Sequence, residues 1–473
     1  MEKKSAGISK WGLVALVVSS SIGSGVFGIT SDLASASAAG PAILAWIIVG
    51  IGILSLVLSL NNLGEKRPDL DGGIFGYAQE SFGTLGGFIS GWGYWLSAWL
   101  GNVAFATMLM SAMGAFFPVF EGGQNIPSIL FASVFIWGLT LIVNNGIESA
   151  SFINTIVTIC KLVPLFLFLV FALIAFKASI FTADFWGNIS NNLTQQAGNQ
   201  VSVWEQVKGC LMVMMWVFVG IEGASVLANR AKKRSDAQQA SIIGLLCLLF
   251  IYILASLLPY GILTQAELAT MEQPAMANIL KEIVGNWGAS VINIGLIISI
   301  IGCWLSWTML PAETTMLMAR DGLLPKNWGK LNQKKAPTYS LVITAVLTNL
   351  FLLTFLVTDY AYQFAYSLCT AAILICYLFV GIYQVQYSFE KKENKQIVIG
   401  LITVVFELMG IILAGFSYVL LCSIAYIPGI YFYWKSCRET SHVMTKKEIG
   451  TILFIGAVAI LSIVLLATGY ITI

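Results

Sequence analysis

Long apolar runs dominate the chain, and short polar connections separate them. Each run holds about 20 or more residues, the length that an α-helix needs to cross roughly 30 Å of hydrocarbon. Strands of an outer-membrane barrel would instead be about 10 residues long with alternating polarity. The pattern predicts an all-α polytopic membrane protein with 12 to 13 transmembrane helices. Thirteen candidate spans can be delimited: 11–36, 41–62, 83–117, 126–145, 151–176, 204–230, 239–262, 286–319, 338–357, 360–386, 397–415, 417–436 and 449–471.

The first apolar run is interrupted at its centre by SSSIGSGVFG, residues 19–28. Each glycine in a helix interior costs about 1 kcal/mol relative to alanine. The sixth run carries a second interruption, MWVFVGIEGAS, residues 215–225. Unwound backbone at mid-membrane is tolerated only where it is buried in protein or lines a cavity. One such cluster alone would favour close helix packing, where small residues are also common.

The two interruptions occupy corresponding places, because each lies in the first span of a set of five. Paired interruptions of this kind indicate a transporter site built from inverted repeats. Freed N–H groups and the positive end of a half-helix can hold a carboxylate there. We therefore expect one transporter domain, with a first repeat at 11–176, a second at 204–386 and additional C-terminal helices at 397–471.

Composition and charge agree with a membrane location. Of the 473 residues, 58% are hydrophobic and 10% are charged, whereas soluble domains carry about 25% charged residues. Lys3, Lys4 and Lys10 precede the first span, and further lysines and arginines follow the second, sixth, eighth, tenth and twelfth spans. These positions share one side if every span crosses, which predicts a cytoplasmic N-terminus in the cell membrane. The net charge of +2 says nothing about an acidic partner, and we expect no nucleic-acid partner.

Several other classes of function lack their signatures. His442 is the only histidine and lies outside the spans, and the eight cysteines form no CxxC pair, so we expect no metal and no cofactor. No GxxxxGK[ST] loop for ATP occurs. An intramembrane enzyme would need a catalytic set such as a GxSxG serine with a histidine or paired aspartates within the spans. A sensor would need a signalling domain. We therefore predict that the chain is not an enzyme.

Charged residues inside the spans are functional hypotheses by default. Lys161, in TICKLVPLF, lies well inside the fifth span. It could stand where another transporter holds sodium, pinning the fifth span to the broken first, or carry a proton, or form a structural ion pair. Glu222 and Glu313 are the only carboxylates that we place deep in spans. They could balance a cationic substrate, relay a proton or lie at solvated helix ends.

Aromatic residues concentrate in three spans. Their π faces can bind a cation at about 0.5–2 kcal/mol each, but they also suit packing or an interfacial belt. They are Trp92, Tyr94, Trp95 and Trp99 in the third span, Trp216 before the second interruption, and Trp304 and Trp307 in the eighth.

At these residues the sequence resembles the amino acid–polyamine–organocation superfamily, and within it the basic amino acid/polyamine antiporters, especially the arginine/ornithine exchangers. The matching motifs run in order from residue 20 to residue 325: IGSGVF, KRPDLDGGIFGYA, GYWLSAWLGN, FINTIVTICKLVPL, WVFVGIEGAS, RAKKRSDAQQA and LSWTMLPAETTMLMARDGLLP. The resemblance implies a leucine-transporter-type fold of five plus five inverted spans with breaks in spans one and six.

The resemblance also implies roles for individual positions. Backbone groups at Ser24 and Gly25, flanked by Ile22 and Gly23, would bind the substrate α-carboxylate, and the carbonyls of Val217 and Val219 would meet the α-amino group. The implied side-chain roles are a gate aromatic at Trp216, a pocket aromatic at Trp307, span-three residues near the site at Tyr94 and Asn102, and a gating acid at Glu222. Val217 departs from the serine of arginine/agmatine exchangers, and Gly28 and Thr30 from a usual leucine and proline.

The leading expectation is an antiporter that imports a cationic amino acid and exports its catabolic product, with arginine and ornithine as first choice. A decarboxylation pair such as histidine and histamine, or a proton-coupled symporter that uses Lys161, remains an alternative. The expected partners are these small molecules and the lipid bilayer, and the sequence leaves a homodimer open.

Overall fold

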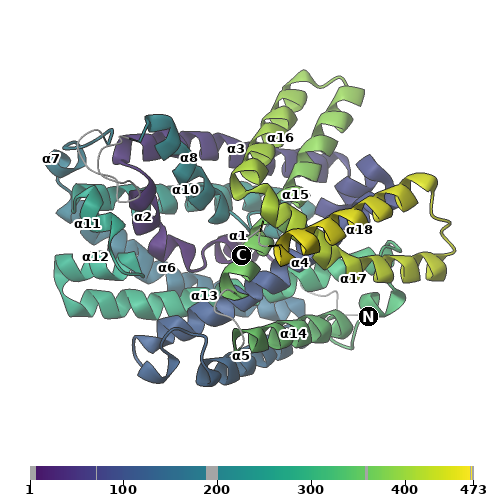
Figure 1. The fold of residues 1–473 in the computed structure, drawn as a ribbon, viewed down its shortest axis with the longest axis horizontal. Helices are drawn as coiled ribbons and strands as arrows, with labels where there is room; N and C mark the ends of the chain where they lie inside the picture. The colour runs from purple at the N-terminus through teal and green to yellow at the C-terminus, as the bar shows by residue number, and fades with distance from the viewer. Residues whose placement is uncertain (1–6, 71, 188–200, 357–360, 469, 471–473) are drawn as a thin grey trace.

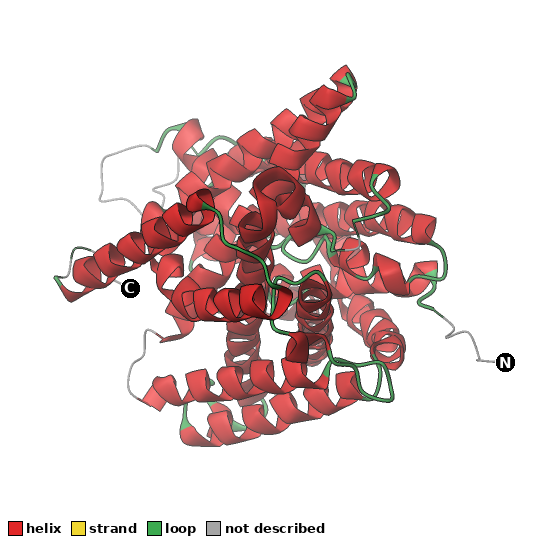
Figure 2. Ribbon diagram, turned by 90° about the vertical axis from the view of Figure 1, so that its right-hand side faces the viewer, coloured by secondary structure: helices red, strands yellow, loops and turns green. Residues whose placement is uncertain are grey.

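The computed structural model describes residues 7–70, 72–187, 201–356, 361–468 and 470, so Lys3 and Lys4 lie outside the described residues. Helices and loops make up this part of the chain, and no strand is drawn in it (Figure 2). The α-helices are α1 (Lys10–Ser21), α2 (Gly25–Ala36), α3 (Ala39–Lys66), α4 (Ile74–Gly114), α5 (Ile126–Asn144), α6 (Ile147–Ala175), α7 (Ala178–Phe181), α8 (Val203–Trp216), α9 (Gly223–Val226), α10 (Arg234–Leu257), α11 (Gln265–Ala269), α12 (Ala275–Val284), α13 (Asn286–Arg320), α14 (Thr338–Leu352), α15 (Ala361–Glu390), α16 (Asn394–Ala414), α17 (Phe416–Thr440) and α18 (Lys446–Ala467).

The predicted all-helical polytopic architecture is confirmed. Within the described residues, eleven helices are long and apolar enough to cross a membrane, and the bent pair α1 and α2 raises the number to twelve. The sixth predicted span is divided into α8 and the short α9, so it forms no continuous crossing helix. The grouping of the spans into two inverted repeats stays a prediction.

Burial separates central helices from peripheral ones. Every residue from Gly12 to Ser21 in α1 is buried, and α1 packs against α6, α10 and α13. Of an 18-residue apolar window, 72% is buried in α4 but only 11% in α18. Figure 1 shows α1 near the centre of the view and α17 and α18 towards one edge. The first helix is therefore enclosed by protein, as unwound backbone within a membrane requires.

The long helix α4 is kinked at Gly83, which has a φ of 76°. Glycine adopts this positive φ without the steric cost that a side chain would add. The kink coincides with the predicted start of the third span at residue 83. Thr84, next to it, donates a hydrogen bond of 2.8 Å to Glu448 in the first turn of α18. The kink of a central helix is thereby tied to the C-terminal helices.

Candidate functional site

The break in the first span lies between α1 and α2. α1 ends at Ser21, Ile22 has extended backbone angles (φ −78°, ψ 92°), and α2 begins at Gly25. The two helices are bent by 43° relative to each other. Gly23 and Ser24 thus lie outside both helices, and the first N–H groups of α2 have no partner within the helix.

The carbonyl groups freed at this break are bound by side chains of α13. Trp307 Nε1 donates to the Ser20 carbonyl at 2.9 Å. Ser299 Oγ lies 3.1 Å from the Ile22 carbonyl and 2.8 Å from the Gly23 carbonyl. Because an unpaired backbone group in a membrane costs several kcal/mol, α13 stabilises the opened end of α1.

The break in the sixth span touches the first break directly. α8 ends at Trp216, and Gly220 has a φ of 105°. Ser20 Oγ donates to the Gly220 carbonyl at 2.7 Å, and a Cβ added at Gly220 would lie 2.7 Å from the Ser20 carbonyl oxygen. Tyr252 donates to the Val217 carbonyl at 2.9 Å, leaving that oxygen one further lone pair. The two interruptions therefore form one structural unit.

Lys161 binds the carbonyl groups of the first break. Its Nζ lies 2.6 Å from the Ile22 carbonyl oxygen, 3.1 Å from the Ser19 carbonyl oxygen and 3.2 Å from Ser19 Oγ. The side chain is fully buried. Among the described residues, no carboxylate forms an ion pair with Lys161. The backbone carbonyl dipoles of Ser19 and Ile22 therefore compensate the charge of its ammonium group. The expected pinning of the fifth span to the broken first span is present in this geometry.

A small cavity of about 30 Å³, here called the central cavity, lies where the two breaks meet. Its wall contains several of the residues predicted from the sequence: Gly23, Ser24, Gly25, Trp216, Val217, Val219 and Trp307. It also contains residues that the sequence reading missed: Ser20, Ser21, Ser97, Gly101, Phe105, Cys303 and Cys369.

Helical periodicity could have found some of the missed residues. Ser97, Gly101 and Phe105 recur every four residues along α4, so they share one face of the helix. Cys303 precedes Trp307 by one turn of α13 in the same way. Ser20 and Ser21 belong to the interrupted motif itself. Nothing in the local sequence distinguishes Cys369, which α15 brings to the wall.

A second, wider cavity of about 1040 Å³ adjoins the central one. The two share Ser24, Gly25, Trp216 and Val217 in their walls. Trp216 therefore lies at the boundary between the two cavities, and its role as a gate aromatic stays a prediction. The described wall of the wide cavity includes the acidic residues Asp32, Glu121 and Glu272 and no lysine or arginine, whereas the central wall holds no charged side chain.

Other predicted residues support the site without lining the central cavity. Tyr94 OH donates to Glu222 Oε1 at 2.9 Å, Tyr377 OH donates to Oε2, and the Gly220 N–H lies 3.1 Å from Oε2. The fully buried Glu222 therefore joins α4 and α15 to the second break. Asn102 Nδ2 lies 3.5 Å from the Trp307 carbonyl. Tyr377 carries no sequence signal because the contact is created by the packing of α15.

Glu313 lies at the opposite end of the site from the wide cavity and forms an ion pair with Arg230 at 2.8 Å. Only 2% of the Glu313 side chain is exposed, so it is not a solvated helix end. Arg230 also donates to the Lys335 carbonyl. Backbone hydrogen bonds join Ile8 to Arg230 and Lys232 at 2.7 and 2.9 Å. These contacts bind the chain before α1 to the chain after α9 and close this end.

Further charged contacts surround the closed end. Arg67 forms ion pairs with Asp69 at 2.7 Å and Glu80 at 3.0 Å, and Arg234 donates to the Pro68 carbonyl. The hydrogen bond from Arg67 holds the pKa of the Asp69 carboxyl below its ordinary value. The polar network ties the loop after α3 to the starts of α4 and α10.

One expectation about the carboxylates is wrong. Glu407 in α16 is also deep in a span, fully buried, and both of its oxygens lack a hydrogen-bond partner among the described residues. The sequence signal was present, since a single acid interrupts the apolar run LITVVFELMG. Glu222 and Glu313 are therefore not the only acids of this kind.

Comparison with known proteins places this geometry among transporters. A sequence profile described as "Amino acid permease" matches residues 8–454. The "Arginine/ornithine antiporter" of Latilactobacillus sakei is 58% identical, with 100% of this chain and 99% of that protein covered. A protein of the same name from Pseudomonas aeruginosa is 38% identical over 94% of this chain and 92% of that protein. The "Arginine/agmatine antiporter" of Chlamydia caviae is 38% identical over 96% of both proteins.

A solved structure supports the fold alone. A Na⁺-coupled sialic acid symporter in a substrate-bound outward-open state aligns with a TM-score of 0.54 and 12% identity, covering 87% of this chain and 89% of that one.

Proposed function

Because the chain belongs to the amino acid permease family, it is a multi-pass membrane transporter, and we propose that it exchanges external arginine for internal ornithine. The proposal rests on a full-length relative of that name at 58% identity and on one structural observation. The two helix breaks meet at a single cavity, with the start of α2 and two tryptophans in its wall.

The start of α2 suits the carboxylate end of an amino acid. The first N–H groups of a helix have no helical partners, and its dipole is positive at this end. Gly25 lets a ligand approach the backbone closely. In this proposal Ser24 and Gly25 bind the α-carboxylate with Ile22 and Gly23 shaping the turn. The carbonyls of Val217 and Val219 accept from the α-amino group.

The cationic end of the substrate is assigned to the aromatic wall. Trp216 and Trp307 line the central cavity, whose described wall holds no carboxylate. A guanidinium or ammonium over such a ring gains about 0.5–2 kcal/mol. Arginine and ornithine share this cationic end and differ in its length, so one site can serve both.

We propose that Lys161 replaces a bound sodium ion and makes exchange independent of sodium. Its ammonium occupies the carbonyl groups of the first break, where a cation would otherwise compensate their partial charges. Glu222 is proposed as the gating acid that couples α4 and α15 to the second break, and Glu313 as its counterpart at the closed end.

The side of the membrane follows from charge. The closed end carries Arg67, Arg230 and Arg234, and a positive-inside arrangement makes this end cytoplasmic. The N-terminus is then cytoplasmic, the wide cavity opens outward, and its acidic residues face the incoming cation.

Counterflow in proteoliposomes tests the function. Vesicles loaded with ornithine should accumulate labelled arginine, and empty vesicles should not. Parallel vesicles loaded with agmatine, histidine or histamine distinguish the alternative pairs. Equal arginine uptake into empty vesicles under a proton gradient would favour a proton-coupled symporter and contradict obligate exchange.

A further inference from the structure

Glu407 is a buried acid that the exchange site does not use. It lies in α16, its exposed fraction is 0%, and neither carboxyl oxygen has a partner among the described residues. By contrast, Glu222 has three donors and Glu313 has an arginine. A carboxylate without a donor in an apolar interior is strongly destabilised, so the Glu407 carboxyl holds its proton in this conformation.

The position of Glu407 can be derived from its helical neighbours. Thr403, Glu407 and Gly410 are spaced four and three residues apart, so they share one face of α16. Thr403 Oγ1 donates to Ser55 Oγ of α3 at 2.9 Å. Gly410 packs against the Met215 side chain of α8. Glu407 therefore lies in the seam that α16 forms with α3 and α8.

Neutral or already partnered groups face this seam. The segments 52–59 of α3 and 211–216 of α8 contain no titratable residue. On α15, between the contacts at Leu374 and Gly381, the titratable residues are Cys376, which donates to the Ser90 carbonyl, and Tyr377, which donates to Glu222. Burial of the Glu407 carboxyl is the cause of its neutral state, since none of these groups supplies a charge.

Exchange, as in the proposed function on which this inference rests, changes the packing of the seam. Trp216, at the end of α8, lines both the central and the wide cavity. When the wide cavity closes and the opposite end opens, α8 must shift relative to its neighbours. Met215 is adjacent to Trp216 and packs on α16 at Gly410. The shift therefore alters the packing beside Glu407.

We propose that Glu407 is a proton-binding site, loaded in this conformation, which releases its proton when α8 separates from α16 in the exchange cycle. The protonated Glu407 carboxyl stabilises the packed arrangement of α8 and α16. The ionised carboxylate favours the separated helices, because water can then solvate it. Exchange should consequently speed up as the pH rises.

Counterflow of arginine against ornithine, measured over about pH 5 to 9, tests the proposal. The wild-type rate should rise with pH, by at most about ten-fold per pH unit for one titrating proton. Glu407→Gln carries a neutral carboxamide that resembles the protonated carboxyl but cannot release a proton, so its exchange should be slow and nearly independent of pH. Glu390→Gln removes an exposed carboxyl from the end of α15 and should keep the wild-type profile.

A direct readout separates this inference from the proposed function. The infrared spectrum of the purified protein at neutral pH should contain a protonated-carboxyl band that Glu407→Gln lacks and Glu390→Gln retains. If the wild type performs no exchange, the proposed function fails while the band still reports on Glu407. If the band is unchanged in Glu407→Gln, or this variant keeps the wild-type rate and pH profile, the proton site is refuted.

A second variant keeps the proposal testable if Glu407→Gln fails to fold. Glu407→Asp keeps a titratable carboxyl on a shorter side chain, so it should retain a rate that rises with pH, with a displaced midpoint. A folded Glu407→Asp protein that exchanges at a pH-independent rate would contradict the proposal.

Discussion

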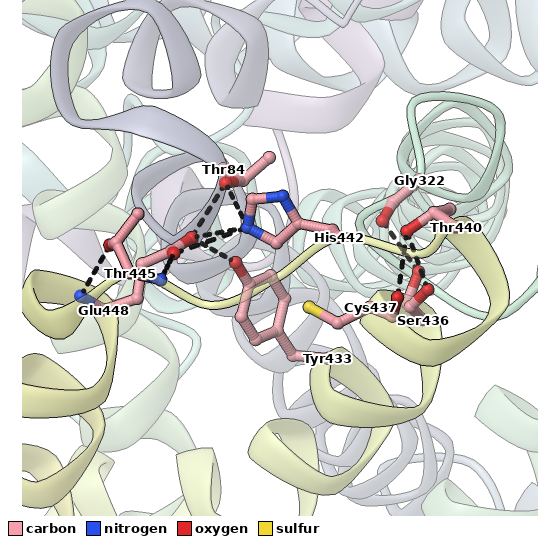
Figure 3. A network of polar contacts seen from close by, with 9 residues as sticks. All are labelled: Thr84, Gly322, Tyr433, Ser436, Cys437, Thr440, His442, Thr445 and Glu448. Atoms are coloured by element: carbon pink, nitrogen blue, oxygen red, sulfur yellow. Dashed lines mark hydrogen bonds and ion pairs between the residues drawn. The ribbon is translucent and has the colours of Figure 1, made fainter.

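The broken-helix core and the C-terminal pair α17 and α18 each contain a buried acid that collects several donors. In the core, Glu222 receives hydrogen bonds from Tyr94, Tyr377 and the Gly220 backbone. At the C-terminal pair, Glu448 plays the same part for a different set of neighbours, and Figure 3 shows its carboxylate at the centre of the contacts. The chemistry of the two acids is similar, but their settings differ.

The network of Glu448 joins three helices. Thr84 of α4 and Tyr433 of α17 donate to its Oε1 at 2.8 and 2.7 Å, and the Thr445 N–H lies 2.6 Å from its Oε2. His442 Nε2 lies 3.1 Å from Oε1. Beside it, Ser436 donates to the Gly322 carbonyl, which attaches α17 to the end of α13 (Figure 3). This network docks the peripheral helices α17 and α18 onto α4 and α13.

A buried, well-partnered acid therefore does not by itself identify a transport site. What distinguishes the core is the opened backbone at Ile22 and Gly220 beside a cavity. Near Glu448 the backbone of α4 kinks at Gly83, but Glu448 lines neither the central nor the wide cavity, and α18 is largely exposed to its surroundings. Perturbing the core should therefore change exchange, and perturbing the C-terminal pair should change stability.

The largest effect is expected from filling the central cavity. A Cβ at Gly25 would lie 3.0 Å from the Val217 side chain, so the side chain of Gly25→Leu would occupy the proposed carboxylate position. Arginine counterflow should be abolished while the protein remains in the membrane. Gly456→Leu in α18, where nothing lies within 4 Å of an added Cβ, is the matched control. Normal exchange by well-expressed Gly25→Leu would remove the functional distinction between the regions.

Removing the ammonium of Lys161 should give the next largest effect. Lys161→Met leaves the Ser19 and Ile22 carbonyls without their cation, at a cost of about 1–3 kcal/mol, so exchange should slow by about 5- to 150-fold. Lys208→Met, at an exposed lysine of α8, should exchange normally. Wild-type counterflow should be unchanged when sodium is replaced by choline. A strict sodium requirement would be incompatible with Lys161 as a substitute for the ion.

A smaller effect is expected from the tryptophans of the cavity wall. Trp216→Leu and Trp307→Leu keep apolar bulk but remove the π face, which should weaken arginine binding by about 1 kcal/mol, or about five-fold. Trp434→Leu in α17, where the ring stacks with Arg438, should leave the affinity unchanged. Unaltered affinity in both core variants would assign these rings to packing.

The smallest effect on exchange is expected at Glu448. Glu448→Gln and Tyr433→Phe weaken the docking network by about 1–2 kcal/mol each, which should lower the thermal unfolding midpoint. The arginine concentration for half-maximal exchange should stay at the wild-type value. A substantial change in that concentration without a loss of stability would show that α17 and α18 act on the site itself.

Much of the molecule follows from local patterns. Each predicted span contains described helix, because a run of about 20 apolar residues in a membrane must satisfy its own backbone hydrogen bonds. The two breaks were predictable because their sequences weaken the helix instead of supporting it. Glycines and serines weaken a helix at a place where only a cavity or enclosing protein can accept free backbone groups.

Tertiary packing decided which side chains complete the site. The chain itself placed Lys161 inside a span, but the approach of α6 to α1 selected the Ser19 and Ile22 carbonyls as its partners. Tyr377 and Cys369 reach the site only because α15 packs along α4. Contacts between residues far apart in sequence depend on how the helices pack, and the hydropathy pattern does not determine that packing.

Glu313 and Glu407 illustrate the same limit. Glu313 could be read as a solvated helix end until the fold brought Arg230 to it. Glu407 is visible in the sequence as a lone acid, yet its lack of partners is a property of the seam between α16, α3 and α8. Residue type and periodicity determine where a charge lies along a helix. Only the packed structure determines whether that charge is paired, because pairing depends on atoms that other segments supply.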